Sequence, residues 1–495
     1  MSSAWRVAAY DDALAAALEE AHARGVFLIG RLEDRRDWGA LAQNGTLERL
    51  AGGRVSGLGV HVFTPAGHAG FASSDRVDPA EARQLVHRAA ALAAAAAMAD
   101  SETSPVVHDL RAEDHSRWDG GARSLAATPP AERHAALLEA HREAMELAAG
   151  LATRSSLSLV DDEWRVVRSD GTDVRFRMPR GVVQHSFTAR GGGRTASAAC
   201  SVSGADDRVL LDSANRARLR ARAARALRRA RDAADAAAVR PGSYRLVLDH
   251  TVAKSLAHEA FGHAAETDVA EASILATGGR LRLGERLARP GLSIVDGPLE
   301  GDFACQPVSA NGLRRQTVAV IRDGLLHSGL GDLFSAARAG APVTGAARAE
   351  SFRSRPTPRM SNIRLVLDRS AALDVPPESL QPTDLAECLM AAGLLAGAGP
   401  TLYLAGWRGG QASPLLGDFV FNCAAIYDLS DGAAPRRPAV FSGKSLSALS
   451  SIVGALGEPV LDEPGQCIKA GQAVPTSGGS HAFVVLEPHP EVTVA

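Results

Sequence analysis

Near the middle of the sequence, an apolar run passes directly into a segment with the residue spacing of a helix. The stretch from Ser243 to Asp268 reads SYRLVLDHTVAKSLAHEAFGHAAETD. Its first part predicts a buried strand, and its second part carries His258, Glu259 and His263 on the predicted helix. Imidazole nitrogens can hold a zinc ion, and a nearby carboxylate that does not bind the ion can take a proton from the metal-held water. We therefore interpret the rest of the chain as support for this strand and helix.

The spacing of the two histidines does not fit a regular helix. Histidines four residues apart lie about 40° apart around a helix, at about 100° per residue. His258 and His263 are five positions apart, which places them about 140° apart and too far round to share one ion. An extra residue in the turn, as in a π-bulge, brings them together, so we predict a distorted turn over residues 260–262. Gly262 suits it, because glycine tolerates unusual dihedrals and close approach of other groups.

Two histidines do not complete a zinc site, and the alternative is a helix with two ordinary histidines. Cys467 is one candidate for the third ligand, because glycines flank its segment and Lys469 is a positive neighbour that favours a thiolate. The alternative for a lone cysteine is a small buried hydrophobic residue. Glu266 is the other candidate ligand, since carboxylates bind zinc in some hydrolases.

Composition limits the class of protein. A chain of 495 residues has room for two or three domains, and a net charge of −2 gives no global attraction to nucleic acid or to anionic membranes. Five widely spaced cysteines, an odd number, argue against a disulfide scaffold and for a reducing compartment. The N-terminus does not resemble a signal peptide, and the longest apolar run is too short to span a bilayer. We expect a cytoplasmic protein with no membrane or nucleic-acid partner.

The pattern of helices and strands predicts an α+β fold. Residues 1–240 are expected to form an N-terminal α/β domain with an antiparallel sheet and helices, and a hairpin is predicted at Asn44-Gly45. Residues 241–495 are expected to form a β-rich, barrel-like domain that carries the His-Glu-x-x-x-His helix. Helices are predicted near residues 11–24, 79–98, 129–149, 214–238, 332–339, 384–392 and 445–456.

The helix predicted over residues 214–238 carries eight arginines between Arg216 and Arg231. We interpret them as a solvated face with alanines turned inward. A nucleic-acid patch is the alternative, but Asp232 and Asp235 interrupt the charge and no aromatic residues are interleaved with it.

Several short motifs carry a family resemblance. Glu266 and Asp268 follow the histidine motif, and the other motifs are Gly70-Phe71-Ala72-Ser73, Asp323-Gly324, Pro358-Arg359-Met360-x-Asn362, Gly417-Asp418-Phe419-x-Phe421 and Cys467-x-Lys469-x-Gly471-Gln472-x-Val474-Pro475. With these motifs, which extend over nearly the full length, the chain resembles the TldD/PmbA family of bacterial proteins. Its histidine helix is similar to that of the catalytic TldD branch.

The resemblance implies a zinc-dependent peptidase. In that family pattern His258, His263 and Cys467 hold the zinc and Glu259 is the general base. Glu266 and Asp268 then act as acids that orient an imidazole, and Arg359, Asn362 and Gly471 support the site or bind substrate. The implied substrates are unfolded or modified peptides, held as an added strand, in leader-peptide removal, natural-product processing or general degradation. The implied assembly is a homodimer or a heterodimer with a TldE/PmbA-like subunit.

The sequence departs from the family at Ser309-Ala310-Asn311-Gly312, where an Asp-x-Glu-Gly segment is common. The two missing acids put substrate contacts at this segment in question. Two other functions stay open from sequence. One is a non-catalytic, peptide-binding partner subunit, although such a protein has no need of Glu259. The other is a structural zinc protein, which would fill all four coordination positions with protein ligands.

Overall fold

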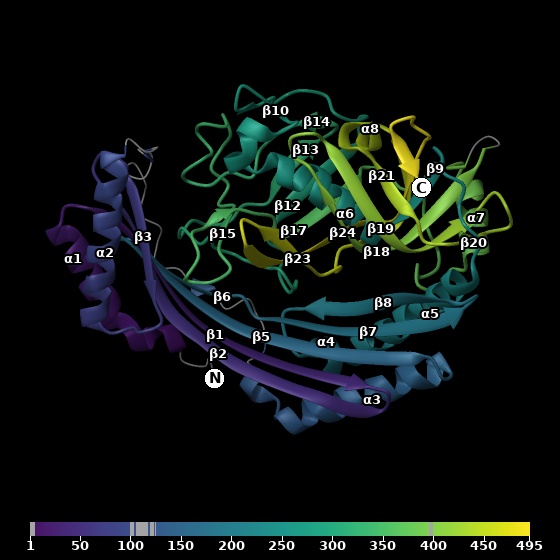
Figure 1. The fold of residues 1–495 in the computed structure, drawn as a ribbon, viewed down its shortest axis with the longest axis horizontal. Helices are drawn as coiled ribbons and strands as arrows, with labels where there is room; N and C mark the ends of the chain where they lie inside the picture. Colours follow the sequence, from purple (N-terminus) through teal and green to yellow (C-terminus); the bar gives the residue numbers. More distant parts are fainter. Residues whose placement is uncertain (1–4, 100–102, 105–116, 119–122, 124, 396–398) are drawn as a thin grey trace.

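The computed structural model describes residues 5–99, 103–104, 117–118, 123, 125–395 and 399–495. Two large sheets dominate it, and the long N-terminal sheet curves beneath a C-terminal body (Figure 1). The predicted α+β class is confirmed. The division at residue 240 stays a prediction. Among the described residues, no helix combines the length and the apolar character needed to cross a membrane.

The N-terminal sheet is mostly antiparallel, in the order β3-β2-β1-β5-β6-β4, with β7 and β8 continuing from β5. Its strands are β1 Phe27–Gln43, β2 Thr46–Phe63, β3 Ala69–Ser74, β4 Arg117–Trp118, β5 Ala152–Arg168, β6 Asp173–Arg177, β7 Arg180–Gly191 and β8 Arg194–Gly204. Asn44 and Gly45 have φ values of 48° and 89°, so the predicted β1–β2 hairpin is confirmed.

Helices cover both ends of this sheet (Figure 1). They are η1 Arg6–Tyr10, α1 Asp11–Ala23, α2 Pro79–Met98, η3 Leu125–Ala127, α3 Pro130–Ala148, α4 Arg208–Leu211 and α5 Ser213–Asp235. Asp78 caps α2 by accepting a hydrogen bond from the Glu81 amide, as the Asp-Pro-x-Glu pattern predicts. The prediction that the arginines of α5 form a solvated face is wrong for three of them, because Arg222, Arg225 and Arg229 are buried.

The C-terminal sheet follows the order β14-β13-β12-β17-β24-β9-β18-β19-β21-β25, with β20, β22 and β23 attached at its side. Its strands are β9 Arg245–Asp249, β12 Leu292–Gly297, β13 Val318–Arg322, β14 Leu325–Leu326, β17 Asn362–Leu367, β18 Thr401–Ala412, β19 Asp418–Asp428, β20 Ala434–Arg436, β21 Val440–Lys444, β22 Ile452–Val460, β23 Gly465–Lys469, β24 Gln472–Leu486 and β25 Val492–Val494. Smaller pairs are β10 Ala276–Thr277 with β11 Arg280–Leu281, and β15 Ala347–Arg348 with β16 Thr357–Pro358.

The expected barrel-like closure is wrong. Within the described residues, β14 and β25 stand at opposite edges of the sheet and no pairing joins them. The sheet does not close on itself, and helices bury its apolar face. The helices that lie on the sheet are α6 His250–Ser255, η4 Leu256–Gly262, α7 Pro382–Ala391 and α8 Ser445–Ser450. The short helices η5 His263–Ala265 and η6 Thr267–Ala272 follow η4.

Two of the predicted C-terminal helices also need correction. Residues 333–340 form turns, and the helix predicted to reach residue 456 ends at Ser450. Ile452 then starts β22, which pairs with β24. The apolar residues of this segment fit both the helical period and the strand period. Pairing with β24 decides that the segment forms a strand.

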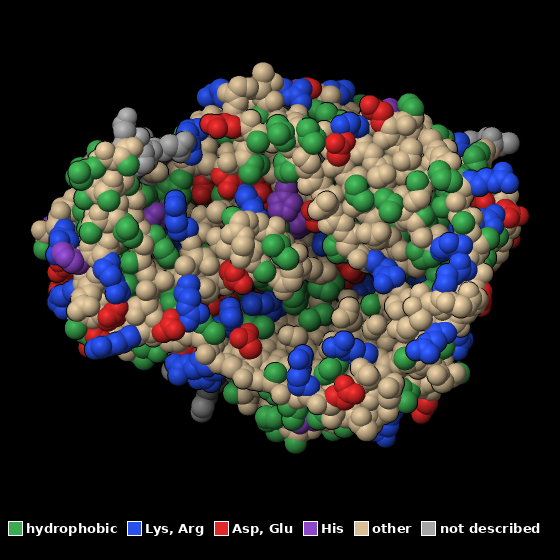
Figure 2. All heavy atoms as spheres, in the orientation of Figure 1, with side chains coloured by type: hydrophobic (Ala, Val, Ile, Leu, Met, Phe, Trp, Pro, Cys, Tyr) green, Lys and Arg blue, Asp and Glu red, His purple; other side chains and the backbone are tan. Residues whose placement is uncertain are grey.

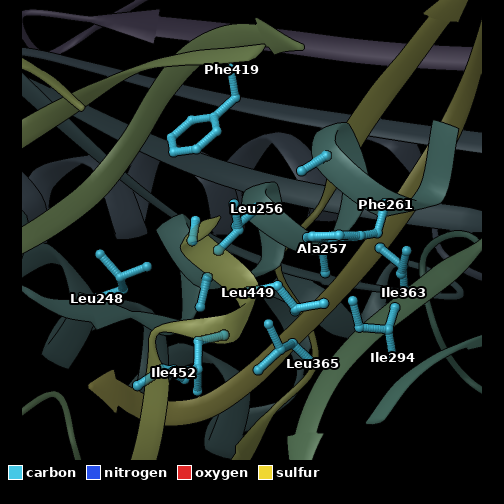
Figure 3. Packing of buried hydrophobic residues seen from close by; sticks show 14 of the residues in the cluster. Leu248, Leu256, Ala257, Phe261, Ile294, Ile363, Leu365, Phe419, Leu449 and Ile452 are labelled. Carbon is cyan, nitrogen blue, oxygen red and sulfur yellow. The ribbon is translucent and has the colours of Figure 1, made fainter. Parts of the chain in front are cut away.

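The largest core surrounds the helix that bears the histidines. Leu256, Ala257 and Phe261 on that helix meet Ile363 and Leu365 of β17, all of them fully buried (Figure 3). Burial on this scale fixes the helix against the sheet, so side chains on its other face are held in position. Figure 2 shows a hollow on this face of the molecule, between the N-terminal sheet and the C-terminal body, with charged side chains around it.

Candidate metal centre

A strand end and a capped helix start position the histidine segment. β9 ends at Asp249, whose Oδ1 accepts hydrogen bonds from the amides of Thr251 and Val252, each at 3.1 Å. The helix then widens into the π-helix η4, so the predicted distortion is confirmed and extends over a longer stretch than residues 260–262. As a result the rings of His258 and His263 lie 5.1 Å apart between centroids, nearly perpendicular to each other.

Gly262 serves this turn for one of the two predicted reasons. Its dihedrals are ordinary for a right-handed helix, φ −58° and ψ −53°, so unusual backbone geometry is not the reason. A Cβ at this position would lie 1.9 Å from Sδ of the fully buried Met360. Glycine is therefore needed because Met360, two residues before β17, and Ile363 of β17 approach the helix closely.

A tight hairpin brings Cys467 to the histidines from 204 residues further along the chain. β23 and β24 pair with Cys467 opposite Val474, and the chain reverses at Ala470 and Gly471 with φ values of 50° and 74°. Because β24 also pairs with β9 and packs against α6, the hairpin lies beside the helix that starts from β9. The turn explains Gly471, since both central residues of such a hairpin need positive φ.

The three candidate ligands meet. One ligand atom each from His258, His263 and Cys467 lies within 4.8 Å of the others. Sγ of Cys467 is 3.4 Å from Nε2 of His263, close to the separation of about 3.6 Å for a sulfur and a nitrogen on one tetrahedral zinc. His258 and Cys467 are buried, with 3% and 1% of their surface exposed.

Arg359 is the cation that contacts the sulfur. Its Nε donates to Sγ of Cys467 at 3.3 Å, and its Nη2 donates to the carbonyl of the same residue. Lys469, the neighbour expected to favour the thiolate, points elsewhere. Its Nζ donates to Glu266 Oε2 at 2.8 Å and to Asp268 Oδ1 at 2.6 Å.

Glu266 orients an imidazole through a direct contact. Its Oε2 lies 3.1 Å from Nδ1 of His263, which leaves Nε2 of that ring facing the sulfur. This is the carboxylate–histidine arrangement that fixes a metal-binding ring. Asp268 reaches the centre only through Lys469. The alternative in which Glu266 replaces Cys467 as ligand stays open, since His263 and Lys469 hold its Oε2 while Oε1 is buried with no hydrogen-bond partner among the described residues.

Burial and neighbouring charges shift the pKa values of four groups at the site. Burial raises the pKa of Glu259, which is half-buried beside the ligands. Burial lowers the pKa of His258, and the charge of Lys254 lowers it further, so this ring is neutral and able to bind a metal. Burial alone would lower the pKa of His263, but Glu266 and Cys467 outweigh it and the pKa is raised. For Glu266, the charges of His263 and Lys469 outweigh burial, and the pKa is lowered.

The donor set fits zinc. Two imidazoles and one thiol are ligands that zinc accepts in tetrahedral sites, and three protein ligands leave one position open. Nδ1 of His258 is buried and has no hydrogen-bond partner among the described residues. A buried ring nitrogen without a partner is costly in a centre without metal and is available to a bound ion.

Asn362 and the segment 309–312 lie outside this cluster of contacts. Nδ2 of Asn362 donates to Leu461 O and Ser477 Oγ, each at 3.1 Å, and so joins β17 to neighbouring strands. Asn311 is fully buried and accepts a 2.6 Å hydrogen bond from Arg31 of the N-terminal sheet. In this chain the segment connects the N-terminal sheet to the C-terminal body.

Sequence reasoning missed two buried cations near the centre. Lys254 lies four residues, about one helical turn, before His258, so the sequence spacing could have placed it near the ligand. Burial lowers the pKa of Lys254, and the charges of Glu259 and Cys467 offset part of this shift. Arg348 donates to the carbonyls of Met360 and Pro475, each at 2.6 Å, and so ties the Met360 segment to β24. No local pattern marks Arg348, because its partners are distant in sequence.

Comparison with known proteins relates both parts of the chain to one family. Residues 241–476 match the model of the PmbA/TldA metallopeptidase C-terminal domain, and residues 31–93 match that of PmbA/TldA metallopeptidase domain 1.

Individual relatives agree with these matches. A metalloprotease of Archaeoglobus fulgidus is 33% identical over 242 residues, which cover 48% of this chain and 51% of that protein. A metalloprotease TldD homolog of Haemophilus influenzae is 29% identical over 237 residues, 47% of this chain and 45% of that protein. The matched region thus spans about half the length of these relatives. Among solved structures, TldE from Thermococcus kodakarensis superimposes with a TM-score of 0.73 over 98% of this chain and all of that chain, at 14% identity. That likeness concerns the fold.

Proposed function

Because the chain belongs to the PmbA/TldD metallopeptidase family, we propose that it is a zinc-dependent peptidase that hydrolyses peptide bonds of unfolded or modified peptides. The observation that carries this proposal is the convergence of His258, His263 and Cys467 beside Glu259. A binding protein or a structural zinc site has no use for a half-buried carboxylate with a raised pKa next to three ligands and an open fourth position.

We assign the zinc to His258, His263 and Cys467. When bound there, zinc acts as a Lewis acid that lowers the pKa of water from about 15.7 to about 7. Glu266 holds the ring of His263 through Nδ1, and Arg359 holds the sulfur of Cys467. These two residues orient the ligands before any substrate arrives.

Glu259 is the proposed general base. A base works best when its pKa lies near the working pH, and burial raises the pKa of this carboxyl towards that range. Its carboxylate accepts the proton from the attacking water and then delivers it to the nitrogen of the leaving amine.

A cavity beside the metal hairpin supports a peptide substrate. Its volume is about 350 Å³, and it lies between Gln466, Ala473 and Pro475 of the hairpin and Asp162 and Arg180 of the N-terminal sheet. Gln466 and Pro475 are paired one position away from Cys467 and Val474, so the cavity lies against the face of the hairpin opposite the Cys467 side chain. An extended segment of a peptide fits such a cavity, which would hold a part of the substrate away from the cleaved bond. Leader-peptide removal or natural-product processing is the form of this activity that we propose.

The assembly belongs to the proposal as well. We propose that the chain acts in the cytoplasm as a homodimer or with a TldE/PmbA-like subunit. The support is the fold shared with TldE from Thermococcus kodakarensis. Light scattering on the purified chain, alone and mixed with a TldE-type subunit of the same cell, measures the assembly directly.

Zinc analysis of purified variants tests the proposal. We expect about one zinc per chain in the unaltered protein and hydrolysis of an unstructured peptide such as casein fragments. Cys467→Ala should lose both zinc and hydrolysis. Cys423→Ala is the matched control, because Cys423 is equally buried at 1% exposure and lies outside the centre.

Two results would count against this assignment. Full zinc content in Cys467→Ala together with zinc loss in Glu266→Ala would transfer the third ligand to Glu266. A zinc-loaded, dimeric protein that cleaves no peptide would favour the non-catalytic partner subunit.

A further inference from the structure

A second polar cavity lies apart from the metal ligands. It has a volume of about 320 Å³ and is enclosed by β7 and β8, helix α5, the start of α6 and residues 406–408 of β18. This volume falls within the range of sites for small molecules, roughly 300–1,000 Å³. His250 at its wall lies eight residues before His258, which corresponds to about 12 Å along a helix axis.

Three arginines of α5 face this cavity. Arg222, Arg225 and Arg229 follow one another at helical spacing and line it together. Their exposed fractions are only 4%, 8% and 6%. Two of them are neutralised, since Arg222 pairs with Asp462 at 2.8 Å and Arg229 pairs with Asp249 at 2.8 Å.

Arg225 differs from its neighbours. Within the described part of the chain, its guanidinium has neither a hydrogen bond nor an ion pair at contact distance. Burial lowers the pKa of Arg225, and the positive charge of Arg229 lowers it further. The negative charges of Asp249 and Glu378 act on Arg225 from beyond contact distance, so its guanidinium has no directly bonded counter-ion. An anion in the cavity would supply one and lower the cost of burying this charge.

Two further polar groups at the wall lack partners. Nδ1 of His250 and Nε1 of Trp407 are both buried with no hydrogen-bond partner among the described residues. His250 is 2% exposed, and the indole N–H of Trp407 can only donate. One acid, Glu463, also lines the cavity, and burial raises its pKa to about 7. Near neutral pH a protonated Glu463 can therefore donate a hydrogen bond as well.

We propose that this cavity binds an oxyanion, the carboxylate or phosphate group of a small molecule, through Arg225, His250 and Trp407. The guanidinium supplies the charge and a planar pair of donors, which matches the oxygens of either group. Free phosphate and the carboxylate of an amino acid or short peptide are the two sources of this chemistry. Binding needs neither zinc nor peptidase activity, so the proposal stands or fails separately from the proposed function.

Isothermal titration calorimetry of the purified full-length chain tests the site. The probes are inorganic phosphate, N-acetylglycine and uncharged N-acetylglycinamide. We expect phosphate or N-acetylglycine to bind, the stronger one identifying the source, and the amide to give no heat. Arg225→Met should weaken the bound probe about tenfold or more, the loss expected for a charge-assisted hydrogen-bonding partner. Arg220→Met is the matched control, because Arg220 is exposed on the same helix, and it should bind as the unaltered protein does.

The proposal is overturned if neither oxyanion binds, or if Arg225→Met and Arg220→Met bind equally well. If circular dichroism shows that Arg225→Met does not fold, Trp407→Phe replaces it, since phenylalanine keeps a ring at this position and removes only the N–H. That variant should weaken binding severalfold, and unchanged affinity would contradict the site.

Discussion

Each candidate ligand at the metal centre is held, or left available, by one particular contact. Glu266 fixes the ring of His263, and Arg359 contacts the sulfur of Cys467. Nδ1 of His258 has no such partner among the described residues. Other residues therefore hold two of the three ligands in position before a metal binds, and the third ligand is not held. Substitutions of the residues around the centre should accordingly have different effects.

Replacing Glu259 separates proton transfer from metal binding. Glu259→Gln keeps the shape of the side chain but cannot accept a proton, so peptide hydrolysis should fall about 10²–10⁴-fold. Zinc content, measured by mass spectrometry, should stay at about one per chain. Glu271→Gln is the control, because Glu271 is exposed shortly after the same helix. Unchanged hydrolysis in Glu259→Gln would remove the proposed base.

Replacing Arg359 tests the contact to the sulfur. Arg359→Met removes the donor to Sγ and should weaken zinc binding about 10–100-fold, as losses of such supporting partners do. Competition with a chelator of known affinity measures this change. Arg369→Met, at an exposed position on the same segment of chain, should leave the affinity unchanged. Equal affinities in the two variants would show that Arg359 has no influence on the ligand.

At this scale the sequence predicts residue types better than contacts. His258, Glu259 and His263 are recognisable because their spacing is local. Lys469 was expected beside the thiolate because it is two residues from Cys467, yet side chains two apart on a strand share a face without being forced together. Its partners Glu266 and Asp268 lie about 200 residues away, and no local pattern predicts that pairing.

Among the elements, the π-helix η4 determines whether the two histidines can act together. The five-residue spacing predicts an irregular turn, and the structure has one. Of the two reasons that the sequence suggests for Gly262, close approach of another group is right and an unusual backbone angle is wrong; the sequence does not show that Met360 is the group that approaches.

This close approach gives a double-mutant test. Gly262→Ala should lower the free energy of unfolding by about 1–3 kcal/mol, because the new Cβ overlaps Sδ of Met360 in a packed core. Gly262→Ala combined with Met360→Ala should lose less than the sum of the two single changes. Urea unfolding of the four proteins measures the coupling. Strictly additive losses would mean that Met360 does not restrict this turn.

The helices and strands also show where prediction from hydrophobic periodicity fails. The Asn44-Gly45 hairpin and the capped helix α2 are predicted correctly because their signals are local. The segment after Ser450 follows β24 into a sheet although its apolar spacing also suits a helix. The prediction of a barrel-like closure is wrong because it also depends on distant partners. Whether β14 and β25 pair is determined by the order of all the strands, which no local pattern shows.

In the molecule as a whole, buried polar contacts join the N-terminal sheet to the C-terminal body. Arg31 of β1 donates to Asn311 Oδ1 at 2.6 Å and to Ala310 O at 2.5 Å, and Arg168 of β5 donates to Asn311 O at 3.0 Å. The segment 309–312, where the sequence suggests a departure from the family pattern, thus lies at the contact between the N-terminal sheet and the C-terminal body.

Asn311→Ala should weaken this junction. The change leaves one buried nitrogen of Arg31 without its side-chain acceptor, which costs about 1–3 kcal/mol. Calorimetry should record a lower unfolding temperature, while the zinc content stays at that of the unaltered protein. Asn422→Ala, at an exposed position of β19, is the comparison and should be nearly neutral. An unaffected unfolding temperature in Asn311→Ala would mean that the junction does not depend on this contact.

The most direct measurement is an anomalous difference map at the zinc absorption edge, collected from crystals of the purified protein. It should contain one strong peak for each chain, bounded by one ring nitrogen each from His258 and His263 and by Sγ of Cys467, with no fourth protein atom on the ion. A peak without the sulfur, a fourth protein ligand, or no peak between the two rings would contradict the peptidase site described for this chain.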